Sequence, residues 1–273
     1  LSHKDPKELD VKLGGIIEIY EKFMGEDPRK IPMKIFPAVH YSMGGLWVDY
    51  NQMTNIPGLF ACGECDYQYH GANRLGANSL LSAIFGGMVA GPKAIEYIRG
   101  LKKSAEDVAS SFFDNEVSRQ TAKYESILAM DGTENAYLLH KELGEWMTNN
   151  MTVVRFNDKL QATIDKIKEL KERYKKINIH DTARWNNAGV AFTRQLWNML
   201  ELAEAMTLGA LLRNESRGAH YKPEFPNRDD ENFLKTTKAK WTSDGPQISY
   251  EDVDVSLIKP RVRDYSSDKK KEG

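Results

Sequence analysis

This sequence has few cysteines, almost no net charge and no long apolar run. Only two of its 273 residues are cysteines, which argues against a disulfide-stapled secreted scaffold and favours a reducing compartment. Two cysteines are also too few to hold a structural zinc ion, so we expect no metal site. No run of about 18 uncharged apolar residues is present, and the sequence therefore predicts no membrane-spanning helix.

The charges of the chain nearly cancel. Its 38 Lys and Arg residues face 39 Asp and Glu residues, which leaves a formal net charge of −1 and removes the global attraction that nucleic acid exerts on basic proteins. We therefore expect no nucleic-acid partner. The chain starts with Leu1 rather than Met, and its first residues lack the regions of a signal peptide. We expect it to begin inside a larger protein.

The first hundred residues alternate between helical and glycine-rich patterns. Asp5 followed by Pro6 is a typical helix start, and apolar residues at helical spacing predict a helix over residues 6–24. An extended linker follows, because three prolines interrupt any regular element: Pro28, Pro32 and Pro37. Short apolar runs predict strands at 46–48 and 59–63.

A long apolar helix is predicted from Asn78 to about Ile98. Gly86, Gly87 and Gly91 lower its helix propensity, so we expect another backbone to pack closely against them.

The residues after Gly100 predict a helical bundle. Four amphipathic segments follow one another, with approximate limits 104–130, 134–150, 155–177 and 189–213. The apolar stripe of the third is Phe156, Leu160, Ile164, Ile167 and Tyr174, and that of the fourth is Leu196, Leu200, Ala203, Met206 and Ala210. From Arg217 onward the sequence is polar, and we expect an irregular tail with a strand or two around Ile248 and Val255.

The stretch from Gly58 to Leu81 carries the most specific chemistry. A buried strand that ends in Gly63 lets a ligand approach the backbone, and Glu64 could then accept a hydrogen bond from a ribityl or ribose hydroxyl. The predicted helix exposes its first N–H groups at Ser79 and Leu80, where they would stabilise the negative charge of a reduced flavin. The pattern predicts an anion or cofactor site.

Two further side chains are candidates for binding a dicarboxylate. Arg74 lies in a loop between Gly71 and Gly76, and a guanidinium binds a carboxylate through two hydrogen bonds. A surface ion pair is the alternative for Arg74. His40, in the segment His40 to Asp49, could donate to a second carboxylate, and a core imidazole satisfied by backbone is its alternative. His70 is a weaker candidate.

Other polar motifs have simpler interpretations. Cys62 and Cys65 form a Cys-x-x-Cys pair, but small buried residues are the favoured interpretation over redox chemistry. The charged run from Lys166 to Lys176 is interpreted as solvated helix surface, with a docking surface as the alternative. The turn from Glu215 to His220 either returns to the cofactor region or caps the bundle.

Several motifs together resemble one protein family. They occur in the order His40 to Asp49, Gly58 to Glu64, His70 to Leu81, Glu215 to His220 and Arg228 to Asn232, and they resemble the flavoprotein subunit of succinate dehydrogenase and fumarate reductase. The tail Ile248-Ser249-Tyr250 with Asp254 to Arg261 is similar to the Gram-positive bacterial form.

The resemblance implies a function for the parent protein. Members oxidise succinate to fumarate by hydride transfer to FAD and pass the electrons to an iron–sulfur subunit. The electrons then reach quinone at a membrane-anchor cytochrome b subunit. The resemblance therefore implies a peripheral location on the cytoplasmic face of the cell membrane. Carried over to this chain, the matches imply that His40 and Arg74 bind the dicarboxylate, that Glu64 is an FAD ligand, and that Ser79 and Leu80 contact the flavin through their backbone.

The resemblance also implies a fold and its divisions. It indicates an α+β fold that is mainly α, in which a remnant of an FAD-binding α/β domain precedes the helical bundle and an irregular C-terminal tail. The implied boundaries are 1–35 for the end of a capping domain, 36–100 for the FAD-binding section, 101–215 for the bundle and 216–273 for the tail.

Other parts of the family pattern are missing from this sequence. The Gly-x-Gly-x-x-Gly fold, the His joined covalently to FAD and the Arg that accepts the proton all precede the matching segment in family members. The chain therefore resembles the C-terminal portion, and no proton-accepting catalytic residue is expected in it. We expect the chain alone neither to retain FAD nor to turn over.

Alternatives from the same superfamily and from another class stay open. Fumarate reductase and L-aspartate oxidase flavoproteins share much of the pattern, although the tail fits aspartate oxidase poorly. A non-catalytic module is the contrasting hypothesis, in which the bundle docks a partner and the glycine-rich half is scaffold.

Overall fold

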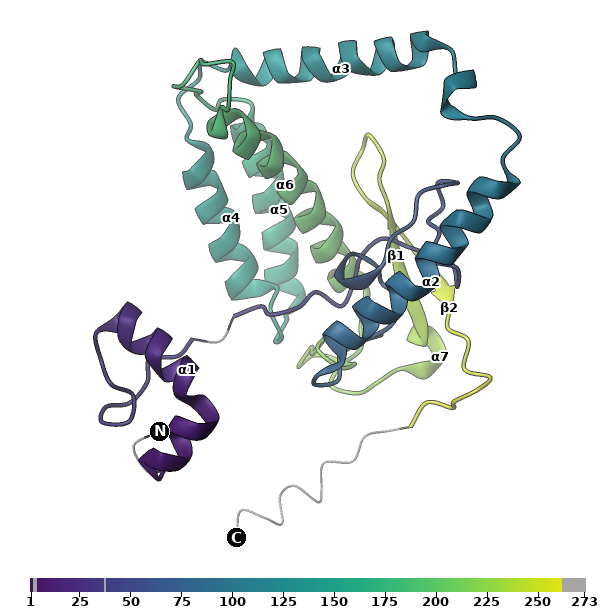
Figure 1. The fold of residues 1–273 in the computed structure, drawn as a ribbon. Helices are drawn as coiled ribbons and strands as arrows, with labels where there is room; N and C mark the ends of the chain where they lie inside the picture. The colour runs from purple at the N-terminus through teal and green to yellow at the C-terminus, as the bar shows by residue number, and fades with distance from the viewer. Residues whose placement is uncertain (2–3, 37, 262–273) are drawn as a thin grey trace. The chain divides into compact units, whose positions relative to one another are not determined.

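The computed structural model describes residues 1, 4–36 and 38–261. Pro37, one of the three predicted linker prolines, lies outside the described residues. The chain divides into two compact units, Leu1–Ser42 and Met43–Gly273 (Figure 1).

The first unit contains the predicted N-terminal helix. Helix α1 (Pro6–Met24) begins at Asp5, whose side chain accepts a hydrogen bond from the Lys7 backbone N–H at 3.1 Å. It ends at Gly25, which has a φ of 68° and so adopts the left-handed conformation that favours glycine at this position. The following loop folds back onto the helix because Arg29 forms ion pairs with Asp10, Glu21 and Asp27.

The second unit opens with irregular chain, and the two strands predicted at 46–48 and 59–63 do not form. Residues there form isolated bridges only, which are Leu46 with Asp66, Val48 with Thr54 and Met53 with Phe60. The chain crosses itself closely at Gly45, where an added Cβ would lie 2.3 Å from the Cys65 carbonyl oxygen. Each segment therefore changes its partner after a single residue, and a ladder cannot extend. The second run is also less buried than predicted, since Leu59 is 46% exposed.

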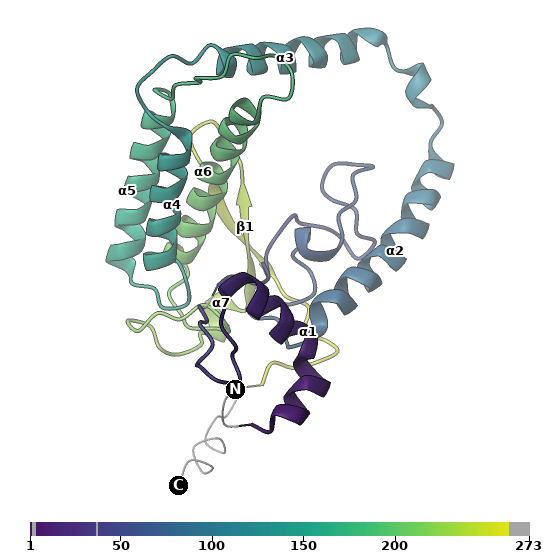
Figure 2. The ribbon, with the colours of Figure 1, turned by 60° about the vertical axis from the view of Figure 1, so that its left-hand side comes forward.

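Helix α2 (Asn78–Gly100) follows the glycine-rich loop, and the prediction of a helix from Asn78 is confirmed (Figure 2). Close packing is confirmed at Gly86, where an added Cβ would lie 3.0 Å from the Cys62 Cβ. It is wrong at Gly87 and Gly91, since an added Cβ there would meet nothing within 4 Å among the described residues.

Four helices form the bundle region. They are α3 (Ser110–Leu128), α4 (Ala136–Asn150), α5 (Asn157–Tyr174) and α6 (Ala188–Leu212). Helices α4, α5 and α6 lie side by side, and α3 contacts the bundle through α6 (Figure 1). The first helix was predicted to start near 104, and this is wrong. Ser104 instead caps a separate 3₁₀ turn, η2 (Ala105–Asp107), after which Val108 and Ala109 are extended.

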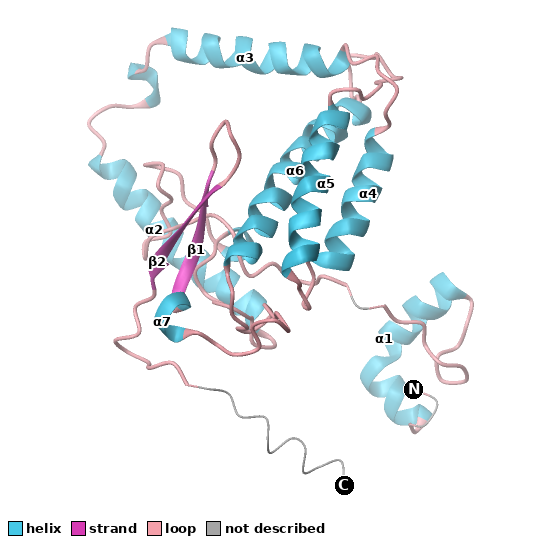
Figure 3. Ribbon diagram, turned by 180° about the vertical axis from the view of Figure 1, so that it is seen from behind, coloured by secondary structure: helices cyan, strands magenta, loops and turns pink. Residues whose placement is uncertain are grey.

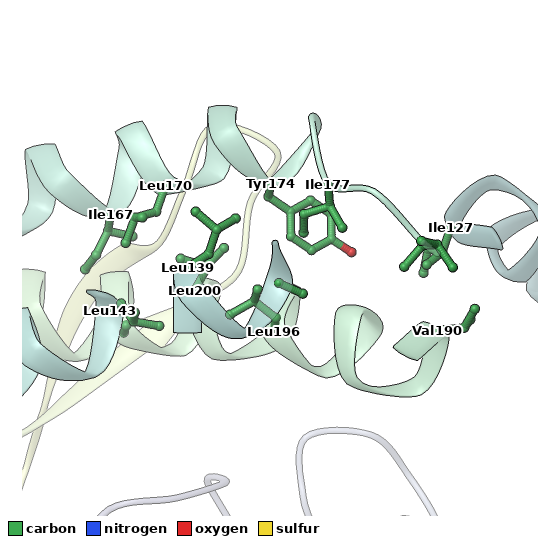
Figure 4. Packing of buried hydrophobic residues seen from close by; sticks show 13 residues of the cluster. Ile127, Leu139, Leu143, Ile167, Leu170, Tyr174, Ile177, Val190, Leu196 and Leu200 are labelled. Atoms are coloured by element: carbon green, nitrogen blue, oxygen red, sulfur yellow. The ribbon is translucent and has the colours of Figure 1, made fainter. Parts of the chain in front are cut away.

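The bundle core consists of side chains from all four helices and the connecting loops (Figure 4). It comprises Ile127, Ala136, Leu139, Leu143, Ile167, Leu170, Tyr174, Ile177, Ile179, Val190, Leu196, Leu200 and Ala203. In α5 the predicted stripe from Leu160 to Tyr174 is buried. In α6 the prediction is wrong at Met206, which is 56% exposed, whereas its neighbour Thr207 is fully buried. Thr207 can be buried because its hydroxyl donates to the Ala203 carbonyl at 2.7 Å.

The C-terminal segment is more ordered than an irregular tail. A short helix α7 (Asp230–Phe233) leads into strands β1 (Lys235–Lys240) and β2 (Gln247–Asp252), which pair antiparallel with Thr237 opposite Tyr250 (Figure 3). Both strands pack against α6. The strand predicted around Ile248 is confirmed as β2, the strand around Val255 does not form, and β1 was missed because its sequence lacks apolar alternation.

Seven α-helices and a single two-stranded sheet make up the regular structure of the described residues. The α+β, mainly α fold class is thereby confirmed. The helices bury the larger core, and the glycine-rich loop with α2 carries the candidate site.

Candidate functional site

The start of α2 lacks a side-chain cap among the described residues. Ala77 precedes the helix in the left-handed conformation, with a φ of 64°, and no side chain of the described residues caps this end. The Asn78 side-chain amide instead donates through Nδ2 to the Leu75 and Gly76 carbonyls at 3.4 and 3.1 Å, and so holds the preceding loop. The next N–H groups, at Ser79 and Leu80, have no partner within the helix and carry the positive end of its dipole.

Arg74 lies in the loop that leads to this helix. The loop bends at Gly71, whose φ is 54°, and again at Ala77, so the unusual backbone expected around Arg74 is present. The Arg74 side chain is half-buried, and its Nη1 donates to the Leu75 carbonyl at 3.2 Å. The guanidinium therefore stays close to the loop that leads into the uncapped helix start.

Glu64 belongs to a short 3₁₀ turn, η1 (Gly63–Cys65), that packs on the first turns of α2. Gly63 has a φ of 80°, and an added Cβ would lie 3.4 Å from the Ala83 Cβ. Ala83 lies one helical turn after Ser79, so this contact brings the exposed Glu64 to the same end of α2. Glu64, Arg74, Ser79 and Leu80 thus belong to one local arrangement.

His70 is linked to the same helix start. Its Nε2 lies 3.0 Å from the Ser82 hydroxyl oxygen, and Ser82 in turn donates to the Ser79 carbonyl at 2.9 Å. Nearby, burial raises the pKa of the Asp66 carboxyl, although N–H groups of Gln68 and Gly63 oppose the shift. These contacts support a structural role for His70 at the base of the loop.

The two cysteines are both free thiols. Cys62 is half-buried, but Cys65 is exposed, and its Sγ lies 3.3 Å from the Cys62 carbonyl oxygen. The interpretation of both as small buried residues is therefore wrong for Cys65, because η1 turns its side chain outward.

His40 belongs to the first unit and lies in an exposed segment outside the helices, whereas Arg74 belongs to the second. The pairing of an imidazole and a guanidinium on opposite carboxylates stays a prediction. The local structure brings together Glu64, Arg74, Ser79 and Leu80 only.

The turn from Glu215 to His220 is a dense polar cluster that the sequence left undecided. The Glu215 carboxylate is fully buried and accepts hydrogen bonds from Arg213, from Arg217 and from the Asp229 backbone N–H. These donors outweigh the effect of burial and lower the pKa of Glu215. A carboxylate held by two guanidinium groups fixes the backbone of the turn.

His220 completes this cluster as a neutral imidazole. Its Nε2 lies 2.9 Å from the Arg213 carbonyl oxygen, which can only accept, so Nε2 carries the proton and donates. Its Nδ1 then accepts from Arg155 Nη1 at 2.6 Å. Burial lowers the pKa of His220 to about 4, and the neighbouring cations Arg155, Lys222 and Arg213 act in the same direction.

The turn reaches the loop that carries Arg74. The Ala219 backbone N–H donates to the Ala72 carbonyl at 3.0 Å, and Gly218, with a φ of 59°, leaves no room for a side chain at this contact. The alternative that the turn returns to the cofactor region is thus the one the structure supports. Gly218 between Arg217 and Ala219 was the sequence signal for a close approach.

The charged run on α5 is less solvated than predicted. The Arg173 side chain, 28% exposed, contacts Glu134 and Glu142 at 2.9 and 2.8 Å. Lys171 contacts Glu204 of α6 at 2.5 Å. These pairs link neighbouring segments of the bundle, so this part of the run is a packing surface between helices.

Neither a cluster of metal-ligating side chains nor a membrane-spanning helix occurs among the described residues. No group of three His, Cys, Asp or Glu residues within 1, 4–36 and 38–261 could hold a metal ion. No helix in those ranges is both long enough and apolar enough to cross a bilayer.

The chemistry of the arrangement follows from its groups. Backbone N–H donors at a helix start stabilise an anion, a guanidinium in the preceding loop binds a carboxylate, and a glutamate accepts hydrogen bonds from hydroxyl groups. These three groups would together suit a cofactor that gains negative charge and an acidic small molecule bound beside it.

Comparison with protein families gives two matches. A family described as "Fumarate reductase flavoprotein C-term" matches residues 140–265, and one described as "FAD binding domain" matches residues 1–80. The second range includes His40, Glu64, Arg74, Ser79 and Leu80.

Relatives match almost the entire chain. The succinate dehydrogenase flavoprotein subunit of Bacillus subtilis is 71% identical over 271 residues, which is 98% of this chain and 46% of that protein. The fumarate reductase flavoprotein subunit of Haemophilus influenzae is 37% identical over 270 residues, again 98% of this chain and 44% of that protein. The chain thus spans about half the length of these relatives.

A solved structure has the same fold. A quinol fumarate reductase chain of Escherichia coli superposes with a TM-score of 0.89 at 36% identity, over 96% of this chain and 45% of that one.

Proposed function

Since this chain is related along nearly its whole length to the flavoprotein subunits of succinate dehydrogenase and fumarate reductase, we propose that it forms part of such a subunit. The parent would oxidise succinate to fumarate with FAD as the hydride acceptor. The observation that carries the proposal is the position of Arg74, in a bent loop that leads directly into the uncapped start of α2. A pure scaffold has no need for a guanidinium in the loop that leads into an uncapped helix start.

Sequence identity favours succinate oxidation over fumarate reduction. Identity to the Bacillus subtilis succinate dehydrogenase subunit is 71%, against 37% to the Haemophilus influenzae fumarate reductase subunit. Fumarate reductase is kept as the second candidate, because both names occur among the relatives and the same groups would bind either dicarboxylate.

The residues of this chain fit FAD. Ser79 and Leu80 present backbone N–H groups without a capping side chain, which suits the charge near N1 and O2 of a reduced flavin. Glu64 is exposed beside Gly63, whose conformation lets a ligand approach the backbone. When bound, FAD supplies the hydride acceptor.

Binding and orientation are the parts that this chain contributes to catalysis. Arg74 would hold one carboxylate of the substrate, and His40 would donate to the other. Gripping both ends fixes the central C–C bond, and precise placement of reacting atoms supplies much of an enzyme's rate. No residue of this chain is assigned the role of proton acceptor.

The proposal extends to domains, partners and location. We assign residues 1–35 to the end of a capping domain, 36–100 to the FAD-binding section, 101–215 to the helical domain and 216–273 to a C-terminal region. An iron–sulfur subunit would receive the electrons, and a membrane-anchor subunit would hold the complex on the cytoplasmic face of the membrane. The match of residues 1–80 to an FAD binding domain supports an FAD-binding section in the first part of the chain, and the likeness to a quinol fumarate reductase chain supports a respiratory complex as the setting.

The test replaces Arg74 in the full-length subunit assembled with its partners. Arg74→Ala should reduce succinate oxidation by at least about 100-fold while leaving the flavin absorption band unchanged, because the clamp and not the cofactor contact is removed. Arg99→Ala, an exposed arginine in the last turn of α2, is the matched control and should keep full activity. Retained turnover in Arg74→Ala would instead support the scaffold hypothesis.

A further inference from the structure

Two glycine-containing turns that are about 150 residues apart in the sequence meet at one backbone contact. The Ala219 N–H donates to the Ala72 carbonyl at 3.0 Å. An added Cβ at Gly218 would lie 2.5 Å from that carbonyl oxygen and 2.8 Å from the Ala72 Cβ. Only glycine permits this approach, because the opposing atoms are backbone that cannot move without moving the loop.

The turn side of the contact is rigid. Arg217 and His220 exchange backbone hydrogen bonds at 2.7 and 3.0 Å, which closes the turn. Beneath it the fully buried Glu215 carboxylate is held by Arg213 and Arg217. Arg217 also contacts Asp230 at 2.7 Å, so the cluster is tied to the segment that leads into the hairpin.

The loop side of the contact is exposed at Ala72, whereas the later loop residues Leu75 and Gly76 accept hydrogen bonds from Asn78. Gly71, Ala72 and Asn73 are exposed, and the backbone bends at Gly71 with a φ of 54°. Ala72 stands two residues before Arg74. The hydrogen bond to the Ala72 carbonyl therefore restrains the backbone from which the Arg74 side chain extends.

We propose that the Glu215–His220 turn is a positioning element for Arg74, with Gly218 as the residue through which it acts. The turn holds the Ala72 carbonyl, and the Ala72 carbonyl fixes the loop that aims the guanidinium at the substrate carboxylate. The inference rests on the proposed function of Arg74. It adds a dependence of dicarboxylate binding on residues that do not touch the substrate.

The experiment measures the dissociation constant of malonate, a dicarboxylate without the oxidisable C–C bond, in the full-length subunit with FAD bound. Gly218→Ala should raise it about tenfold or more, because a displaced guanidinium loses its bidentate geometry. The matched control is Gly25→Ala. Gly25 has a similar φ of 68°, but an added Cβ there would meet nothing within 4 Å among the described residues, so malonate binding should stay within twofold of wild type.

A double-mutant cycle separates positioning from general damage. Arg74→Lys keeps the charge but not the bidentate geometry, so it should weaken malonate binding by itself. If Gly218 acts through Arg74, Gly218→Ala should change the dissociation constant less than twofold in the Arg74→Lys background. Equal fold-changes in both backgrounds, or wild-type binding in Gly218→Ala, would overturn the inference.

Asp230→Asn covers the case in which Gly218→Ala does not fold. It removes the ion pairs that Asp230, 39% exposed, forms with Arg217 and with Arg228, and leaves the Arg217–Glu215 pair in place. The variant should raise the dissociation constant about two- to fivefold in the wild-type background alone. A rise of the same size in the Arg74→Lys background would count against the inference. Unchanged malonate binding in Arg74→Ala would refute the proposed function itself, a result distinct from all of these.

Discussion

The indole nitrogen of Trp47 donates to the Glu251 carboxylate, with distances of 3.3 and 3.2 Å to its two oxygens. The two residues are separated by 204 positions in the sequence. Lys238 of β1 joins them, since its Nζ lies 2.6 Å from the Glu251 carboxylate and 5.1 Å from the centre of the indole ring. The hairpin of the C-terminal segment is thereby attached to the chain that leads into the glycine-rich loop and α2.

Trp47→Phe should loosen the hairpin. The phenyl ring can still lie under Lys238, but the hydrogen bond to Glu251 is lost, at a cost of about 1 kcal/mol. Hydrogen–deuterium exchange of the β1 and β2 amides should accelerate about fivefold. Trp241→Phe is the matched control, because Trp241 also donates to a glutamate but is 68% exposed, and it should change exchange less. Equal exchange in both variants would contradict the fastening role.

His220 should make the protein sensitive to acid. Its pKa is about 4 in the folded state and 6.5 in a model peptide, so between these values the unfolded state binds a proton that the folded state does not. Stability is therefore lost as the pH falls from 6.5 to 4, by about 3 kcal/mol. Urea denaturation of wild type and His220→Gln at several pH values should show a shallower loss in the variant. If the free energy of unfolding fell equally with pH in both proteins, His220 would not be the cause of the acid sensitivity.

Leu200→Ala should strongly destabilise the bundle. Leu200 is fully buried in the core, and truncating a buried leucine leaves a cavity that costs about 2–5 kcal/mol. Leu202, two residues along the same helix, is 64% exposed, and Leu202→Ala should cost about 0.5 kcal/mol or less. Urea denaturation midpoints measure both. A similar loss in the two variants would mean that the burial of α6 differs from that described.

Two glycines should respond to alanine with opposite signs. An added Cβ at Gly132 would lie 2.0 Å from the Lys176 carbonyl oxygen, so Gly132→Ala should destabilise by about 2–3 kcal/mol. Gly144 is inside α4, and an added Cβ would meet nothing within 4 Å among the described residues. Gly144→Ala should stabilise by about 0.5–1 kcal/mol, because alanine loses less backbone entropy in a helix. Thermal unfolding midpoints should fall in Gly132→Ala and rise in Gly144→Ala. A lower midpoint in both variants would contradict the prediction for Gly144.

Elements with a local signal were predictable. Helix α1 has its N-cap at Asp5 and its C-cap at Gly25, and the buried face of α5 shows in the spacing of Leu160, Ile164 and Ile167. Such signals depend on residues within a turn or two of each other, so the sequence displays them directly. The segment 46–48 failed as a strand because its partner, Asp66, bridges for one residue only.

The candidate site also has features that the sequence reveals and features that it does not. Residue type and spacing were enough to identify the residues that could bind, because Arg74, Glu64 and the start of α2 belong to one continuous stretch. The contact of the turn containing Gly218 with Ala72, and the burial of Glu215 between two arginines, were visible in the folded chain alone. Contacts between residues about 150 positions apart depend on the tertiary packing of the chain, and the local spacing of residues does not reveal that packing.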